Sequence, residues 1–399
     1  MMQLSDRVTF TGVLNPNMRI FDVIMRTEYG TSYNSYAVRG SEATALIDGA
    51  HGRFAGQLLG EVSQALGGKA PDYLIVNHTE PDHSGAIAAL LEAYPSLCVV
   101  TNAVAAKYLA QITNRAALPL QIVKDGDTLC LGDRTLRFCT APFLHWPDTM
   151  FTYLEEEQAL FSCDFLGCHY CEPTLLDTAI AYPDAYAQAR QYYYDCIFSP
   201  FPRFVRNGLS VLEALPVGAV YPSHGPVLTK GGRLEETVLL YQAWSREQAP
   251  RPCRIPLFYC TAYGNTRRIG EAVRAGVLEV LPEAEAELID LSEQTDMPAL
   301  RQKLNACDAF LLGAMTINRD APPPLWELLA GADAINIAKR PCALFGSYGW
   351  SGEGFGNMAQ RLQMLKCKLY DAQCKVNFVP GAAELAQAHA FGKAFAQTL

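Results

Sequence analysis

The stretch His78-Thr79-Glu80-Pro81-Asp82-His83 places four side chains that can bind a metal within six residues. It follows the apolar, β-rich run Tyr73 to Asn77, and the segment Ser84 to Glu92 behind it has helical spacing with a serine at the expected N-cap. The pattern therefore predicts a strand, an irregular loop that carries ligands, and a helix. Such loops at the carboxyl ends of strands are where layered α/β proteins usually carry their chemistry. Taken alone, the cluster is also compatible with a solvated polar turn.

The composition is that of a globular protein of two or three domains, because the chain has 399 residues and half of them are hydrophobic. A net charge of −9 without a basic stripe argues against nucleic acid or an anionic membrane as the main partner. The first residues lack the apolar core of a signal peptide, and no run approaches the roughly 18 apolar residues of a membrane span. We therefore expect a cytoplasmic protein.

Cysteine usage points to a reducing compartment. The thirteen cysteines are scattered and odd in number, which indicates reduced thiols rather than a disulfide framework. The C-x-x-C motif from Cys168 to Cys171 has no second pair with which to build a zinc ribbon or a rubredoxin site, and its role stays open.

Alternating short apolar runs and turns predict a domain of mixed strands and helices from the start of the chain to about Gln248. Within it, residues 8–48 read as β-hairpins, with Met18 to Met25 as one strand. The proline-broken segment Gln248-Ala249-Pro250-Arg251-Pro252 predicts a linker, and a regular β-α-β-α rhythm follows it. We expect two domains, residues 1–249 and residues 253–399.

Three further ligand positions lie where short apolar runs end. His145 follows one such run, Asp164 ends the run Ala159 to Cys163, and His224 sits on a turn after Ala219 to Tyr221. A lone histidine of this kind is often a hydrogen-bonded structural residue. Together with the six-residue cluster, the three positions favour a metal site.

The second part of the chain opens with a predicted strand, Arg254 to Tyr259, and a turn before a helix from Arg267 to Leu281. The turn is Thr261-Ala262-Tyr263-Gly264-Asn265-Thr266. Hydroxyl groups and backbone N–H groups at a helix N-terminus bind phosphate. The turn lacks the lysine of a Walker loop and the G-x-G-x-x-G of a dinucleotide site, so it resembles the FMN phosphate loop of flavodoxins. Tyr263 departs from that resemblance, since many flavodoxins have a small hydroxyl residue there.

Two later loops follow predicted buried strands. The first carries Met315, Thr316, Ile317 and Asn318, and the second carries Ser347, Tyr348, Gly349 and Trp350. Ligands bind at the carboxyl ends of strands in doubly wound sheets, where Tyr348 or Trp350 would cover an isoalloxazine ring. The alternative is that both aromatic residues are ordinary core or surface residues.

The order H-x-E-x-D-H, His, Asp, His resembles the metallo-β-lactamase fold, an αββα sandwich with a two-metal site at one edge of its sheets. Hydrolytic members usually have His where this chain has Glu80. Three carboxylates with four histidines form an oxygen-rich set that suits iron better than zinc. The resemblance assigns one iron to His78, Glu80, His145 and Asp164. It assigns the other to Asp82, His83, Asp164 and His224.

A metallo-β-lactamase-like domain followed by a flavodoxin-like, doubly wound, five-stranded parallel sheet resembles the flavodiiron protein family over essentially the whole chain. The resemblance implies reduction of O2 to water, of NO to N2O, or of both, with FMN and two non-haem irons as cofactors. It also implies a head-to-tail homodimer or a dimer of dimers. Because paired C-x-x-C motifs and a nicotinamide fingerprint are missing, electrons should come from a separate carrier such as rubredoxin. Candidates for tuning the choice of gas are Tyr29, Tyr33, Trp146 and Tyr193.

Two other classes of function stay open. One is a dizinc hydrolase of the metallo-β-lactamase fold fused to a flavodoxin module, against which Glu80 and the flavin loops argue. The other is a flavin electron carrier whose first domain has lost its metals, against which the full set of ligand positions argues. Measuring the iron and zinc content of the purified protein distinguishes the flavodiiron enzyme, the dizinc hydrolase and the metal-free electron carrier.

Overall fold

The computed structural model describes residues 2–246, 251–293 and 296–399. The chain divides into two compact units, Met1–Glu247 and Gln248–Leu399, which we call the first and second domains. Of the predicted linker, residues 248–250 lie outside the described residues. No helix in the described part of the chain is both long enough and apolar enough to span a membrane.

Two β-sheets form the centre of the first domain. The strands of the seven-stranded sheet are, in spatial order, β1 (Met2–Gln3), β2 (Val8–Phe10), β7 (Tyr36–Arg39), β8 (Thr44–Ile47), β9 (Tyr73–Ile75), β10 (Cys98–Thr101) and β11 (Leu120–Ile122). Those of the six-stranded sheet are β12 (Thr128–Cys130), β13 (Thr135–Thr140), β14 (Met150–Leu154), β15 (Ala159–Cys163), β16 (Ala219–Pro222) and β17 (Leu228–Thr229).

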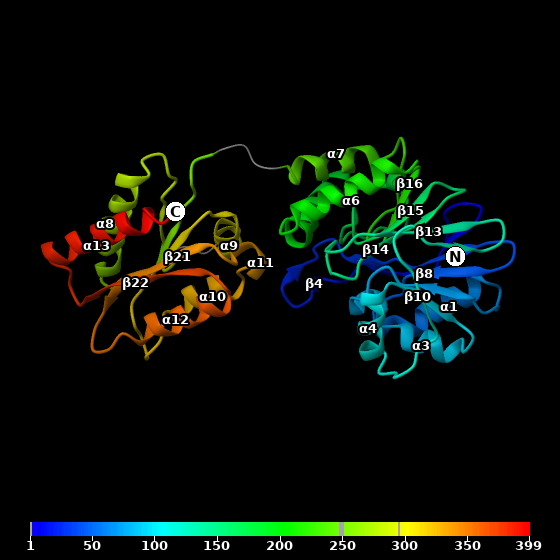
Figure 1. Ribbon diagram of the computed structural model, residues 1–399, viewed down its shortest axis with the longest axis horizontal. Coiled ribbons are helices and arrows are strands. Elements are labelled where there is room, and N and C mark those ends of the chain that lie inside the picture. The colour runs from blue at the N-terminus through cyan, green and yellow to red at the C-terminus, as the bar shows by residue number, and fades with distance from the viewer. Residues whose placement is uncertain (1, 247–250, 294–295) are drawn as a thin grey trace. The chain divides into compact units, whose positions relative to one another are not determined.

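Helices cover the outer face of each sheet (Figure 1). One apolar core lies between the sheets and joins residues such as Val38 and Phe138. A second core joins the seven-stranded sheet to α1 (Ala55–Ala65), α3 (Ile87–Ala93) and α4 (Ala103–Ile112). A third joins the six-stranded sheet to α5 (Pro183–Tyr193), α6 (Pro202–Ala214) and α7 (Leu234–Trp244). Burial of apolar side chains on both faces of both sheets confirms the predicted αββα sandwich.

The predicted strand from Met18 to Met25 is wrong, because a tight turn divides it. The turn separates β4 (Ile20–Phe21) from β5 (Met25–Arg26), which pair antiparallel. Asp22 and Val23 adopt φ angles of 45° and 68°, which an extended strand does not allow. The hairpin projects from a neighbouring two-stranded sheet of β3 (Val13–Asn15) and β6 (Thr31–Tyr33).

The ligand motif from His78 to His83 is also more regular than predicted. Asp82 and His83 lie in a short helix, α2 (Pro81–Ser84), rather than on an irregular loop. Ser84 does not cap the next helix, because its hydroxyl donates to the Thr79 carbonyl oxygen at 2.7 Å. Pro81 at the first helical position favours this turn, since its fixed φ suits a helix start and its missing N–H is not needed there.

The second domain is a five-stranded parallel sheet with helices on both faces (Figure 1), as predicted. Its strands are, in spatial order, β19 (Leu288–Asp290), β18 (Leu257–Tyr259), β20 (Phe310–Ala314), β21 (Pro341–Tyr348) and β22 (Lys368–Asn377). This order is that of flavodoxin-like folds. One face packs on α8 (Asn265–Val280) and α13 (Ala382–Ala396). The other packs on α9 (Met297–Ala306), α10 (Pro323–Ala330), α11 (Ala334–Ile337) and α12 (Glu353–Met364).

Candidate metal and flavin sites

Seven predicted ligands converge at one edge of the two sheets of the first domain. They follow the carboxyl ends of β9, β15 and β16, lie in α2, or belong to the β13–β14 connection: His78, Glu80, Asp82, His83, His145, Asp164 and His224. Six of them are buried, and His145 is partly exposed. Residues separated by more than 140 positions in the sequence therefore share one polar site inside an apolar sandwich.

The ligand atoms form two groups. In the first, His78, Glu80, His145 and Asp164 each offer an atom within 4.8 Å of the others, and in the second Asp82, His83 and His224 do so. The closest pairs are His145 Nε2 with Glu80 Oε2 at 2.9 Å, and His224 Nε2 with Asp82 Oδ2 at 3.0 Å. Two groups of this composition fit two metal ions.

Asp164 faces both groups with different oxygens. Its Oδ1 lies 3.1 Å from His83 Nε2 and 3.4 Å from His224 Nε2. Its Oδ2 lies 3.5 Å from His145 Nε2 and 3.6 Å from His78 Nε2. Because each oxygen points into one group, the carboxylate is placed to bridge two ions.

The site also holds buried polar atoms that the protein leaves unpaired. Within the described residues, no hydrogen bond reaches either carboxylate oxygen of Asp82 or Asp164, or either ring nitrogen of His83. These atoms approach one another to about 3 Å without hydrogen-bond geometry, so they point at a shared space and not at each other. A buried polar atom without a partner costs about 1–3 kcal/mol, and a bound cation removes that cost.

The electrostatics of the cluster keep the carboxylates of Glu80 and Asp164 anionic. Burial opposes charge on Asp164, but His83 and His145 beside it hold the pKa of that carboxyl well below its usual range. Burial likewise acts against protonation of His145, yet contacts with Asp164 and Glu80 raise its pKa to about 10. Metal ligands must be deprotonated, so the ionised carboxylates are ready for cations, whereas His145 would release its proton when a metal binds.

Residues behind the ligands hold them in position. Asp148 is fully buried and accepts hydrogen bonds from the Thr79 N–H at 2.8 Å and the Thr79 hydroxyl at 2.7 Å. On the other side of the site, His224 Nδ1 lies 2.6 Å from the Ser32 carbonyl oxygen. The sequence analysis missed both supports, although Asp148 stands only three residues after His145.

A cavity of about 310 Å³ opens in front of the carboxylates Glu80 and Asp82. Of the four residues suggested for tuning the choice of gas, Tyr33 and Trp146 line this cavity. Tyr193 is buried beside His224, with ring centroids 6.2 Å apart. Tyr29 instead donates its hydroxyl to Gln188 and does not line the cavity.

His169 is a further buried group at this site that sequence reasoning did not assign. Its ring lies 4.7 Å from that of His224, measured between centroids, and its Nδ1 lies 2.8 Å from the Thr31 hydroxyl. Burial and the neighbouring His224 hold its pKa well below the ordinary value, so the ring is neutral. The flanking cysteines of the C-x-x-C motif, Cys168 and Cys171, belong to neither ligand group, and no disulfide joins the cysteines that the structure describes.

In the second domain, the predicted phosphate turn follows β18 and leads into α8. Gly264 is the N-cap with a φ of 79°, a left-handed conformation that favours glycine. The helix begins at Asn265, so the backbone N–H groups of its first turn are available to a ligand. The Thr266 hydroxyl is buried and finds no partner among the described residues, which fits a phosphate acceptor. Thr261, Ala262 and Tyr263 complete the turn, and Tyr263 is 92% exposed.

The other two predicted loops lie at the same edge of the sheet. Met315, Thr316, Ile317 and Asn318 follow β20, and the buried Thr316 hydroxyl also has no partner in the described part of the chain. Ser347 and Tyr348 end strand β21 and are not loop residues as predicted, whereas Gly349 and Trp350 lie beyond it. Trp350 is 97% exposed. All three segments therefore present groups at the carboxyl edge, as an FMN site requires.

A fourth segment supports this edge and was missed from the sequence. Phe378 follows β22 with a φ of 57°, and its N–H donates to the Tyr348 carbonyl oxygen at 2.8 Å. Asn377 donates to the same oxygen through its side chain at 3.2 Å. Phe378 is 56% exposed, so the segment offers a second aromatic side chain beside the loop of Trp350.

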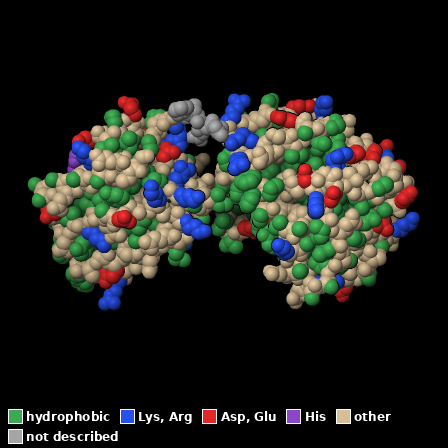
Figure 2. All heavy atoms as spheres, in the orientation of Figure 1, with side chains coloured by type: hydrophobic (Ala, Val, Ile, Leu, Met, Phe, Trp, Pro, Cys, Tyr) green, Lys and Arg blue, Asp and Glu red, His purple; other side chains and the backbone are tan. Residues whose placement is uncertain are grey.

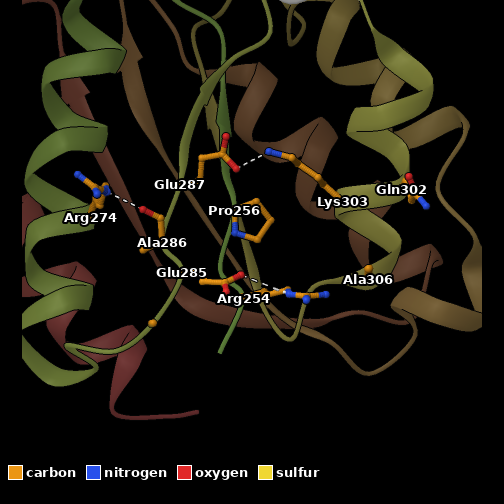
Figure 3. Close-up of a pocket in the computed structure, with 10 residues that line it drawn as sticks. Arg254, Pro256, Arg274, Glu285, Ala286, Glu287, Gln302, Lys303 and Ala306 are labelled. Carbon is orange, nitrogen blue, oxygen red and sulfur yellow. Dashed lines mark hydrogen bonds and ion pairs between the residues drawn. The ribbon is translucent and has the colours of Figure 1, made fainter. Parts of the chain in front are cut away.

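A larger pocket of about 640 Å³ lies at the opposite, amino edge of the same sheet (Figure 3). Its charged groups have partners: Lys303 pairs with Glu287 at 2.5 Å, Arg254 pairs with Glu285 at 3.3 Å, and Arg274 donates to the Ala286 carbonyl oxygen. None of the predicted flavin residues lines the pocket, so it is separate from the proposed flavin site.

On the face in Figure 2, Lys and Arg side chains gather over the part of the second domain that holds α9 and α11.

Comparison with known families divides the chain in the same way. Residues 31–225 match the ODP family beta lactamase, and residues 257–388 match the flavodoxin family. Among solved structures, the chain is similar to the rubredoxin oxygen:oxidoreductase of Desulfovibrio gigas, with a TM-score of 0.73 and 24% identity over 100% of this chain and 98% of that one. The flavodiiron protein of Giardia intestinalis gives a TM-score of 0.70 and 24% identity, covering 99% and 96%. These two likenesses concern the fold.

Sequence relatives are closer. The chain is 44% identical to the flavo-diiron protein FprA2 of Clostridium acetobutylicum, over 100% of this chain and 99% of that protein. It is 36% identical to the type A flavoprotein fprA of Rhodobacter capsulatus, over 98% of this chain and 90% of that one. With matches of this extent across both domains, the chain belongs to the flavodiiron protein family.

Proposed function

We propose that this chain reduces O2 to water, NO to N2O, or both, at a diiron site that receives electrons through FMN. The chain is a flavodiiron oxidoreductase, and its cofactors are FMN and a non-haem diiron centre. The observation that carries the proposal is the position of Asp164, whose two oxygens face two separate groups of ligands. We assign the metal site to residues 1–249 and the flavin site to residues 253–399.

The proposed ligands fit iron by their chemistry. His78, Glu80, His145 and Asp164 would hold one ion, and Asp82, His83, Asp164 and His224 the other. Three carboxylates against two divalent ions leave a nearly neutral site, and hard oxygen donors stabilise the oxidised metal. When bound, two ferrous ions and reduced FMN together supply the four electrons that O2 needs, while coupling of two NO molecules needs two.

The protein's own contribution is to hold the metal ligands in a fixed orientation and to keep water away from them. The cavity in front of Glu80 and Asp82 has Phe21, Tyr33 and Trp146 among its walls, and we assign to these rings the role of limiting the access of water to the ligands. Behind the ligands, Asp148 and the Ser32 carbonyl oxygen hold the rings of His78 and His224. Ligands held in this way would keep their orientation when the metals bind.

The flavin would be held at the carboxyl edge of the second sheet. The first turn of α8 and the hydroxyl of Thr266 would bind its phosphate, and Trp350 or Tyr348 would cover its ring. Gly346 allows the approach of the neighbouring strands there: with a φ of 146°, a Cβ at this position would lie 1.9 Å from the Ala314 carbonyl oxygen.

Electrons would come from a separate carrier. A related structure is named a rubredoxin oxygen:oxidoreductase, which makes a rubredoxin-type protein the first donor to test. We also propose a head-to-tail homodimer, alone or as a dimer of dimers, in which the FMN of one chain serves the irons of the other. The alternative of a dizinc hydrolase fused to a flavodoxin module is not favoured, because Glu80 adds a carboxylate where such hydrolases usually have histidine.

The test combines cofactor analysis with a gas assay. Anaerobically loaded protein should contain about two irons and one FMN per chain, and an anaerobic assay supplied with a reduced carrier should measure turnover of O2 and of NO separately. Turnover of either gas supports the proposal, and the ratio of the two rates identifies the working substrate. Zinc at full occupancy in protein grown with ample iron, together with hydrolase activity, would contradict it.

A further inference from the structure

A third group of potential ligands overlaps the two proposed iron positions. It consists of His83, Cys163 and Asp164, which are all buried and whose ligand atoms lie within 4.8 Å of one another. Cys163 belongs to neither of the two groups proposed to bind iron. It nevertheless places a thiol within 4.8 Å of a histidine and a carboxylate that belong to them.

The backbone explains why two consecutive residues reach the same space. Adjacent side chains of a strand normally point to opposite faces of the sheet, so Cys163 and Asp164 should diverge. Cys163 instead has a φ of 52°, and the pairing of β15 with β16 shifts register between Phe161 and Cys163. This irregularity ends the alternation of side chains across the sheet at the last residue of β15. The side chains of Cys163 and Asp164 can therefore both point toward the metal ligands.

The groups that the thiol meets are themselves unpaired. Within the described part of the chain, neither ring nitrogen of His83 and neither oxygen of Asp164 makes a hydrogen bond, and both side chains are about 1% exposed. Three buried donors of different kinds, imidazole, carboxylate and thiol, therefore face one space. Zinc and cobalt(II) accept this mixture in tetrahedral sites with one position left for water.

We propose that His83, Cys163 and Asp164 form an alternative site for a single thiophilic divalent ion, zinc or cobalt(II), in competition with the iron pair. Binding forms a metal–sulfur bond and releases the thiol proton to solvent. The two states exclude each other, because His83 and Asp164 also belong to the proposed iron ligands. Cys163 is then a determinant of which metal the protein retains when iron is scarce.

The test is a cobalt(II) titration of the full-length chain after its metals have been removed by chelation. One equivalent of cobalt(II) should produce the near-ultraviolet charge-transfer absorption of a thiolate–cobalt bond. The substitution Cys163→Ser keeps the size of the side chain and should abolish that absorption. Cys168→Ser is the matched control, since Cys168 is an equally buried thiol of the same domain outside all three ligand groups, and it should keep the absorption.

Zinc affinity gives a second measurement. In competition with a chromogenic chelator, Cys163→Ser should bind zinc at least about tenfold more weakly than wild type, because even groups one layer behind a metal ligand change affinity by that much. Cys168→Ser should match wild type. An unchanged cobalt spectrum and zinc affinity in Cys163→Ser would overturn the proposal.

X-ray absorption of the wild-type protein with one zinc bound covers the case in which the variant does not fold. The spectrum should contain one sulfur neighbour at about 2.3 Å, and a shell of nitrogen and oxygen alone would overturn the proposal. The iron and FMN content of the wild type tests the proposed function separately. A failure of the proposed zinc or cobalt site can therefore be distinguished from a failure of the proposed function.

Discussion

Asp148 lies directly behind His78: its Oδ2 is 3.5 Å from His78 Nδ1, while His78 Nε2 faces Glu80 at 3.3 Å and Asp164 at 3.6 Å. Neither the His78 nor the Asp148 side chain is exposed to solvent. The histidine is thus held between a carboxylate on one ring nitrogen and the proposed metal position on the other. Such a carboxylate fixes the ring orientation and strengthens the imidazole as a ligand.

We predict that Asp148→Asn weakens iron binding on the order of 10- to 100-fold, because the ring of His78 loses its orienting charge. Iron retained during titration with a chelator measures this. Asp177→Asn is the matched control, since Asp177 is also a buried aspartate of the first domain but accepts hydrogen bonds from Thr229 and Arg233. Equal loss of iron in both variants would assign the effect to general destabilisation.

Asp82→Ala or His83→Ala should abolish gas reduction and lower the iron content, while FMN stays bound. The reason is that these ligands and the flavin segments belong to different domains. The iron-to-FMN ratio of purified protein provides the measurement. Asp184→Ala, which removes an exposed carboxylate of the first domain, should leave the ratio unchanged. Loss of flavin together with iron would argue against independent sites.

Thr266→Val should weaken FMN binding on the order of 10- to 100-fold, the effect of losing one hydrogen bond to a charged phosphate. Valine keeps the shape of the side chain at this buried position and removes its unpaired hydroxyl. Flavin fluorescence during titration of the apoprotein reports the affinity. Thr398→Val, at an exposed position of the same domain, should bind FMN normally. Wild-type affinity in Thr266→Val would place the phosphate elsewhere.

NADH alone should reduce the bound FMN slowly or not at all, because the sequence contains no nicotinamide-binding fingerprint. Addition of a rubredoxin-type carrier and its reductase should restore turnover. Stopped-flow bleaching of the flavin, with and without the carrier, makes the comparison. Rapid oxidation of NADH by the isolated chain would contradict an external carrier.

The proposed head-to-tail dimer predicts complementation between two inactive chains. One chain carries Asp82→Ala and His83→Ala, and the other carries Asn265→Ala and Thr266→Ala. In a mixed dimer, the FMN of the first chain would meet the irons of the second, which restores one of two equivalent sites and about half of the wild-type activity. The mixed dimer is isolated with two different affinity tags and assayed for gas reduction. An inactive mixed dimer with correctly loaded cofactors would show that each chain uses its own flavin.

Local sequence patterns determined the class of each domain and the kinds of ligand. Strand and helix periodicity reports which residues are buried, and ends of apolar runs mark where polar side chains emerge. The order of His78, Glu80, Asp82 and His83 is legible because these residues are neighbours in the chain. The same applies to the turn that ends at Thr266. Patterns of this range predicted mixed strands and helices in the first domain and the β-α-β-α order of the second, and the αββα sandwich followed from the family resemblance that the ligand motif carries.

Only the tertiary structure decided how these residues meet. Asp164 faces His83 and His145 through different oxygens because two sheets pack face to face and bring the ends of their strands together, and no local pattern encodes that distance. The turn at Asp22 divides a segment that the sequence predicts as one strand, and no sequence pattern marks the left-handed conformation of Cys163. Asp148 behind His78 and His169 beside His224 likewise depend on contacts between segments about 55 to 70 residues apart. Sequence periodicity describes one helix or strand at a time. The positions of the Asp164 carboxylate and the Cys163 thiol depend on how several such elements pack together.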